Sequence, residues 1–149
     1  MLLKSDGSPW RPVVHVQDIA AAFLAALTAP REAVHDQAFN ITGENYQIRD
    51  LALIVAETVP DCAVQLAEGA SPDLRDYRVD GAKAAERLGF TASWTARLGA
   101  AELYQAFRWT GLTLDELEGP RFQRVAQLRQ LTDRGLLDDS LRVRTGLPA

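Results

Sequence analysis

Apolar residues recur at helical spacing in two segments of the first half of the chain. Residues 19–28 are apolar on almost every side, which predicts a helix buried on more than one face, with Asp18 as its N-cap and Pro30 as its stop. Residues 47–58 predict a second, amphipathic helix, whose apolar stripe consists of Ile48, Leu51, Ala52 and Val55.

Short β-branched or apolar runs between these segments predict strands. They lie at residues 12–16, 38–42 and 63–67, and residues 68–76 are polar and typical of a loop. Asp80 is placed to cap a short helix that runs to Leu88, and Gly89 follows at the position where helices favour glycine.

Helical signals dominate after residue 81. Thr95 is expected to cap a helix to about Trp109, and Thr113 with Glu116 matches a capping box. Pro120 suits the first turn of a further helix that ends near residue 135. The predicted order of elements is β-α-β-α-β-(β)-α-α-α-α, which is an α/β fold class.

Composition narrows the functional classes. The chain has 149 residues, about one domain, with ordinary hydrophobic (47%) and charged (24%) fractions. A net charge of −4 argues against non-specific nucleic-acid binding.

The single cysteine, Cys62, allows no internal disulfide, and no apolar run is long enough to span a bilayer, so we expect a cytoplasmic protein. The two histidines, His15 and His35, lack metal-ligand spacing, so no metal site is expected.

Three blocks resemble the extended short-chain dehydrogenases, the NAD-dependent sugar-nucleotide epimerases and dehydratases. Residues 10–20 (WRPVVHVQDIA) are similar to the family's R-x-x-V-H-V-x-D-[ILV]-A segment, and residues 39–43 (FNITG) to its F-N-[ILV]-x-[GS] strand. Residues 73–83 (DLRDYRVDGAK) are similar to D-x-R-x-Y-x-x-D-x-[ST]-K, with Ala82 where the family has Ser or Thr. In a fourth block, Trp94 and Gly99 match a helix entry in which Arg97 and Leu98 replace two acidic residues.

The resemblance implies a nucleotide-diphosphate sugar as the ligand. Arg11 is expected to contact the diphosphate, and Arg75 is expected to close on the phosphates, with Arg78 as its competitor. Asn45, near the start of the second helix, is a further substrate-binding candidate, although it or Gln47 could instead cap that helix. The alternative for each arginine is an exposed side chain beside a turn or loop.

Neither the cofactor turn nor the catalytic pair of that family is present in the sequence. There is no G-x-x-G-x-x-G spacing, and no tyrosine has a lysine four residues on. We therefore expect no catalytic residue and no cofactor bound by this chain alone, while the resemblance implies NAD(P) for the full-length family. Since the family's R-x-x-V-H-V segment lies well into the chain, we expect a C-terminal part that lacks the cofactor-binding half.

The expected architecture is an incomplete Rossmann-type sheet remnant with a small, mostly helical substrate-binding subdomain. Residues 1–44 would end the nucleotide-binding sheet, residues 45–109 would form the subdomain and residues 110–149 a helical tail. An alternative function is a non-enzymatic interaction module or a partner segment of a split enzyme, because the tail carries an apolar side and the missing sheet would expose apolar surface. Expected partners are the sugar nucleotide, the missing half or a second copy of the chain, with no membrane.

Overall fold

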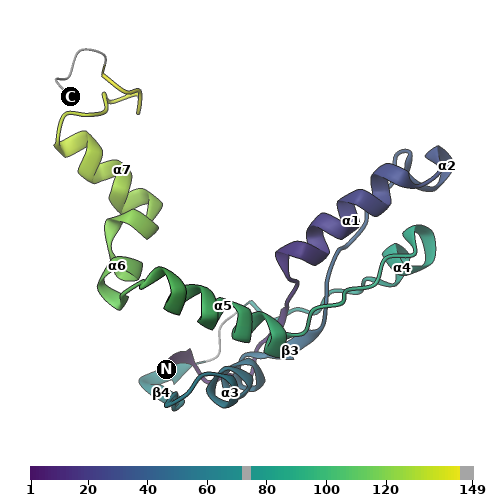
Figure 1. The fold of residues 1–149 in the computed structure, drawn as a ribbon, viewed down its shortest axis with the longest axis horizontal. Helices are drawn as coiled ribbons and strands as arrows, with labels where there is room; N and C mark the ends of the chain where they lie inside the picture. The colour runs from purple at the N-terminus through teal and green to yellow at the C-terminus, as the bar shows by residue number, and fades with distance from the viewer. Residues whose placement is uncertain (72–74, 145–149) are drawn as a thin grey trace. The chain divides into compact units, whose positions relative to one another are not determined.

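The computed structural model describes residues 1–71 and 75–144 (Figure 1). Asp73 and Leu74 of the loop block, and the last five residues of the expected tail, lie outside the described residues. The chain divides into two compact units, residues 1–104 and residues from 105 onward.

The first unit mixes short strands with helices of up to thirteen residues. Its elements are β1 (Leu2–Ser5), β2 (Trp10–Pro12), α1 (Val16–Thr28), α2 (Arg31–Val34), β3 (Asn45–Gln47), α3 (Ile48–Thr58), β4 (Gln65–Ser71) and α4 (Ala82–Leu88), followed by the start of α5 (Ala96–Thr110). This confirms a mixed α/β class.

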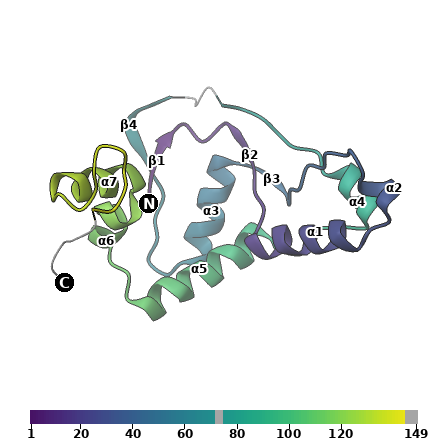
Figure 2. The same cartoon turned by 90° about the horizontal axis from the view of Figure 1, so that it is seen from above.

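The strands form two separate pairs. β1 pairs with β4 in parallel, and β2 pairs with β3 antiparallel, with Arg11 opposite Tyr46. Figure 2 shows β2 beside β3, from which the chain passes directly into α3. The strand prediction for residues 38–42 is wrong, because this segment has no ladder partner among the described residues. The strand predicted at residues 12–16 is wrong except at Pro12, because β2 ends there and α1 begins at Val16. The strand predicted at residues 63–67 begins at Gln65 and extends to Ser71, so the first residues of the predicted loop 68–76 belong to β4.

Helix α1 begins earlier than the sequence predicts, and Asp18 is not its cap. The N-cap is His15, whose Nδ1 accepts the backbone N–H of Gln17 at 3.2 Å. Asp18 lies in the first turn and is 2% exposed. Its carboxylate is bonded to residues 93 and 94 instead, so a tertiary contact replaces the expected local one.

Later local signals hold well. Helix α3 is confirmed within one residue of its predicted start, and Gly89 ends α4 in the left-handed region at φ +63°. Thr95 Oγ1 accepts the N–H of Leu98 in the first turn of α5, as expected for a cap. These ends are confirmed because each depends on groups within four residues of one another.

The core of this unit is small and lies between α1 and α4. Ala22, Ala84 and Phe90 are buried there, with Ala25, Phe39, Ile41, Leu88 and Ala92 packed around them. Figures 1 and 2 both show α1 and α4 side by side.

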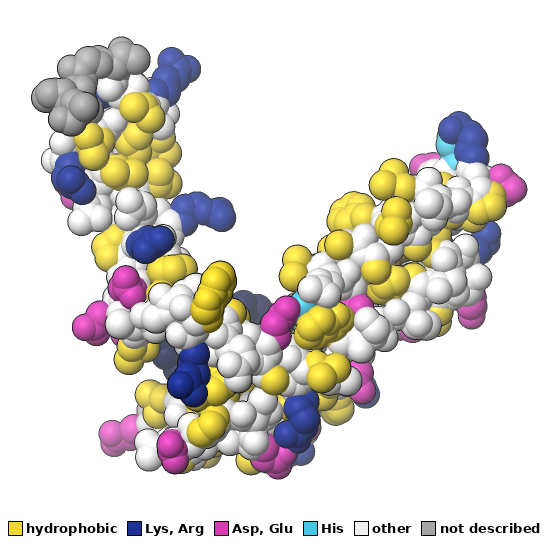
Figure 3. Space-filling view, viewed as in Figure 1, with side chains coloured by type: hydrophobic (Ala, Val, Ile, Leu, Met, Phe, Trp, Pro, Cys, Tyr) yellow, Lys and Arg dark blue, Asp and Glu magenta, His cyan; other side chains and the backbone are white. Residues whose placement is uncertain are grey.

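The opposite side of α1 is exposed, which contradicts the prediction of a helix buried on several faces. Phe23 is 69% and Leu27 82% exposed, and Val16 and Leu24 are also open. Hydrophobic side chains gather over α1 in Figure 3. The small Ala22 makes the core contact of α1. Among the described residues, nothing covers the larger side chains of Val16, Phe23, Leu24 and Leu27.

The second unit is helical. It contains the end of α5, then α6 (Leu114–Glu118), the 3₁₀ turn η1 (Pro120–Phe122) and α7 (Arg124–Asp133). The capping box of Thr113 and Glu116 is confirmed. The helix predicted to begin at Pro120 is interrupted at Gln123, whose backbone is extended at φ −110° and ψ 94°.

Across the described residues, no helix has the length and apolar character of a membrane span.

Candidate functional site

The two sequence blocks that carry the candidate arginines meet in the structure. The Arg11 guanidinium donates to the backbone carbonyls of Trp10, at 2.7 Å, and of Arg75. In return, the Trp10 N–H donates to Asp76 Oδ1 at 2.8 Å. Residues more than sixty positions apart in the sequence therefore lie against each other along β2.

Aromatic rings alternate with the guanidinium groups at this contact. The Arg78 guanidinium lies 4.8 Å from the centre of the Trp10 ring, and that of Arg11 lies 5.8 Å from the Tyr77 ring. Each arginine thus sits over a ring from the other segment, an arrangement that orients the cation. Arg75, whose backbone carbonyl accepts the bond from Arg11 and whose side chain is exposed, belongs to the same contact, so Arg11, Arg75 and Arg78 form an arginine cluster.

Such a cluster is suited to a phosphate-containing anion. A guanidinium keeps its charge at all physiological pH values and offers a planar fork of donors that matches phosphate oxygens. Arg11 is half-buried while Arg75 and Arg78 are exposed, so the cluster combines a fixed member with two that solvent can reach. The local positive charge arises within a chain whose net charge is −4.

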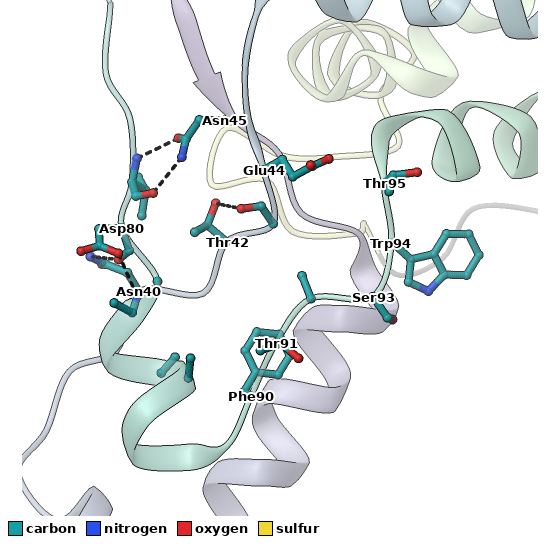
Figure 4. A pocket seen from close by; sticks show the side chains of 17 residues that line it. Asn40, Thr42, Glu44, Asn45, Asp80, Phe90, Thr91, Ser93, Trp94 and Thr95 are labelled. Atoms are coloured by element: carbon teal, nitrogen blue, oxygen red, sulfur yellow. Dashed lines mark hydrogen bonds between the residues drawn. The ribbon is translucent and has the colours of Figure 1, made fainter.

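Asn45, the fourth residue expected at the site, is bonded to the backbone of the loop. Its Nδ2 donates to the Val79 carbonyl and its Oδ1 accepts the Val79 N–H, both at 2.9 Å (Figure 4). Gln47 is the N-cap residue of α3 and makes no side-chain cap bond. The structure thus gives Asn45 a contact that spacing in the sequence did not suggest.

A cavity of about 470 Å³ with a mixed polar and apolar lining adjoins this contact. Asn45 and Val79 form part of its wall. Small and aromatic residues form an apolar part, and the hydroxyl, amide and carboxylate groups come from Asn40, Thr42, Glu44, Asp80, Thr91, Ser93 and Thr95 (Figure 4). Among the described residues that line it, none is a lysine or arginine. Its chemistry suits uncharged polar groups better than phosphates.

Sequence reasoning missed a second junction, built on Asp18. Its carboxylate accepts the N–H and hydroxyl of Ser93, at 3.0 and 2.9 Å, and the N–H of Trp94 at 3.0 Å. Burial alone would raise the pKa of Asp18, but these bonds outweigh it and hold the pKa below its ordinary value. One signal was available, since Asp18 is the single acidic residue in the apolar stretch of residues 7–31.

His15 belongs to the same junction. Its ring stacks on Trp94 with 3.8 Å between centroids, and its Nε2 lies 2.7 Å from Glu102 Oε2. Because Nδ1 accepts a backbone N–H, Nε2 carries the proton and donates to Glu102. His15 is thus packed against Trp94 and hydrogen-bonded through both ring nitrogens.

The surroundings of Tyr46 do not favour a role as a catalytic base. The Tyr46 hydroxyl donates to Glu44, and burial together with that carboxylate raises its pKa above the ordinary value. A tyrosine that removes a proton needs a pKa below its ordinary value.

Within the described residues, no His, Cys, Asp and Glu side chains gather into a metal-binding group.

Comparison with known proteins gives a partial family match and a shared fold. The model of the NAD dependent epimerase/dehydratase family matches residues 1–42, which include Arg11. Among curated proteins, no sequence matches the chain.

Several solved structures resemble this one. L-threonine dehydrogenase from Clostridium difficile is 15% identical (TM-score 0.64), and the match covers 76% of this chain and 37% of that one. UDP-glucuronic acid 4-epimerase from Bacillus cereus, solved with UDP-glucuronic acid and NAD, is 18% identical (TM-score 0.62; 73% and 35% covered). RMD from Pseudomonas aeruginosa, solved with NADPH, is 18% identical (TM-score 0.60; 74% and 36% covered).

These likenesses concern the fold, at identities below 25%. The matches span about 35–37% of the length of those three proteins. The chain therefore shares the α/β fold of part of the Rossmann-like dehydrogenases and epimerases, and its residues 1–42 match the NAD dependent epimerase/dehydratase family.

Proposed function

We propose that this chain binds a nucleotide-diphosphate sugar, as the substrate-binding part of an NAD-dependent sugar-nucleotide epimerase or dehydratase. The observation that carries the proposal is the contact of Arg11 with the backbone of Arg75, which joins two arginine blocks into one cluster. The family match over residues 1–42 supports it, and so does the fold shared with an epimerase solved with UDP-glucuronic acid.

In this proposal the arginine cluster receives the diphosphate. Arg11 lies on β2 and donates to the carbonyls of Trp10 and Arg75, so it provides the anchored charge. Arg75 and Arg78 approach the ligand from the loop. The cavity beside Asn45 offers hydrogen-bonding groups, and the described residues that line it add no positive charge. The role of Asn45 is one of support, because both ends of its carboxamide are already bonded to Val79.

We propose further that the chain is not catalytically competent by itself. The residues present do not fit an NAD(P) site, since the sequence has no glycine-rich turn and Tyr46 has a raised pKa and no lysine four residues on. Residues 1–44 would end the nucleotide-binding sheet, residues 45–109 would form the substrate-binding subdomain and residues 110–149 a helical tail. A cofactor-binding half would supply hydride and proton transfer.

Titration calorimetry with UDP-glucuronic acid, UDP and inorganic pyrophosphate tests the binding role. We expect all three to bind, and Arg11→Ala to weaken binding by about tenfold or more, because charge-assisted bonds to an anion are lost. Arg11→Lys should recover only part of the affinity, since a lysine lacks the fork. The control is Arg97→Ala, since Arg97 is exposed and pairs with Glu57. Equal affinity of Arg11→Ala and the unmodified chain would contradict the proposal.

The exposed side of α1 favours a second candidate, an interaction module or a partner segment of a split enzyme. Phe23, Leu24 and Leu27 are each more than 60% exposed on one helix. A patch of this kind is typical of a surface that another polypeptide covers. Sedimentation of the full chain with and without a candidate partner would test it, and a monomer that binds no protein yet binds sugar nucleotides would exclude it.

A further inference from the structure

The loop that carries Arg75 and Arg78 is held to β3 by one side chain. The carboxamide of Asn45 exchanges two hydrogen bonds with Val79, and both measure 2.9 Å. A carboxamide presents a donor and an acceptor side by side, so it replaces the pair of bonds that a residue of a neighbouring strand would exchange. Figure 4 shows both bonds from Asn45 to the same segment.

A second attachment lies at the other end of this short stretch. The Trp10 N–H donates to Asp76 Oδ1 at 2.8 Å. Trp10 and Asn45 belong to paired strands, because β2 and β3 pair with Pro12 opposite Asn45. The two attachments therefore bracket Tyr77 and Arg78 and fix them against the hairpin that carries Arg11.

We propose that Asn45 is a positioning residue for anion binding. It holds residues 75–79 so that Arg75 and Arg78 lie within reach of the anion that Arg11 binds. This inference rests on the proposed function for its ligand, but the clamp itself can be measured without any ligand. This role differs from direct contact of Asn45 with the substrate. Oδ1 already accepts a hydrogen bond from Val79 and Nδ2 already donates one to it, so neither atom needs a partner from the substrate.

The chemistry of an amide gives a sharp test. In Asn45→Asp, an ionised carboxylate still accepts the Val79 N–H, but its second oxygen faces the Val79 carbonyl and repels it. A protonated carboxyl group supplies a donor again and restores both bonds. The Asn45–Val79 pairing in this variant should therefore be weak at neutral pH and recover in acid, whereas in the unmodified chain those two bonds involve no titrating group. The Asp76 carboxylate that accepts the Trp10 N–H is present in both, so comparison at each pH removes its effect.

The experiment is calorimetry of the full chain with inorganic pyrophosphate at about pH 7 and about pH 4. Asn45→Asp should bind about tenfold more weakly than the unmodified chain at neutral pH, and the difference should shrink at the lower pH, where the introduced carboxyl group is partly protonated. Comparison at each pH removes the effect of pyrophosphate protonation. The matched control is Gln37→Glu, which adds the same charge at an exposed side chain that bonds the neighbouring Asp36 carbonyl, and it should keep its affinity.

Amide hydrogen exchange at Val79 in the ligand-free chain separates the two proposals. We expect protection of the Val79 N–H in the unmodified chain, its loss at all pH values in Asn45→Ala, and its recovery in acid in Asn45→Asp. If this pattern appears but pyrophosphate does not bind, the proposed function fails while the clamp stands. If Asn45→Asp and Asn45→Ala match the unmodified chain in exchange and in affinity, the positioning role is overturned.

Discussion

The carboxylate of Asp18 accepts the backbone N–H of Trp94 at 3.0 Å, which ties the first turn of α1 to the segment that enters α5. Two further bonds come from Ser93, and the side chain is almost completely buried. A buried carboxylate is tolerated only when its oxygens are well bonded. The junction therefore fixes the start of α1 against residues 93 and 94.

Removing the Asp18 carboxylate should destabilise the chain. Asp18→Ala leaves the N–H groups of Ser93 and Trp94 without their acceptor, which we expect to cost about 3 kcal/mol of unfolding free energy. Asp18→Asn should cost less, because one oxygen remains. Urea unfolding followed by circular dichroism measures both. Gln17→Ala, an exposed change in the same turn, is the control, and a loss as large as that of Asp18→Ala there would argue against the junction.

The same group should make stability depend on pH. Its pKa in the folded chain lies below the ordinary value of 3.8, so folding favours the ionised form. The contribution is complete above about pH 5 and is lost as the pH falls through 3.8 towards the lower folded pKa. Thermal unfolding from pH 7 down to pH 2 checks this. Asp18→Asn should show a shallower acid decline, and an identical decline would show that other carboxylates are responsible.

Two glycines with positive φ should differ in their tolerance of alanine. At Gly89 (φ +63°) an added Cβ meets nothing within 4 Å, so Gly89→Ala should cost only backbone strain, about 1 kcal/mol. At Gly7 (φ +81°) the Cβ would lie 2.8 Å from the Cβ of Arg49, where no flexible end can yield. We expect Gly7→Ala to cost at least twice as much. Equal melting temperatures of the two variants would contradict this prediction.

The exposed apolar side of α1 should make the isolated chain self-associate or unfold at modest temperature. Phe23 and Leu27 are the most exposed large residues on that side apart from Val16, and their burial in a contact would be favourable. Phe23→Glu with Leu27→Lys should lower the mass measured by light scattering at high concentration. The control Ala21→Glu changes a small exposed residue of the same helix. A clean monomer with cooperative, high-temperature unfolding of the unmodified chain would refute the expectation.

Local signals in the sequence predicted much of the helical structure. The stripe of α3, the left-handed Gly89, the Thr95 cap and the capping box of Thr113 and Glu116 all lie where the sequence places them. Each depends on groups close together in the chain, so composition and spacing are sufficient. Residues 38–42 fail as a strand because a strand requires a partner that the segment itself does not contain.

The sequence by itself determined which side chains could bind an anion, because the guanidinium groups of Arg11, Arg75 and Arg78 are fixed by residue type. Only the tertiary structure decided that these residues lie together, that Asn45 bonds to Val79, and that Asp18 is a buried acceptor instead of a cap. The reason is physical. A polar side chain can satisfy its hydrogen bonds in several local ways, and the choice among them depends on which distant backbone groups folding brings within 3 Å.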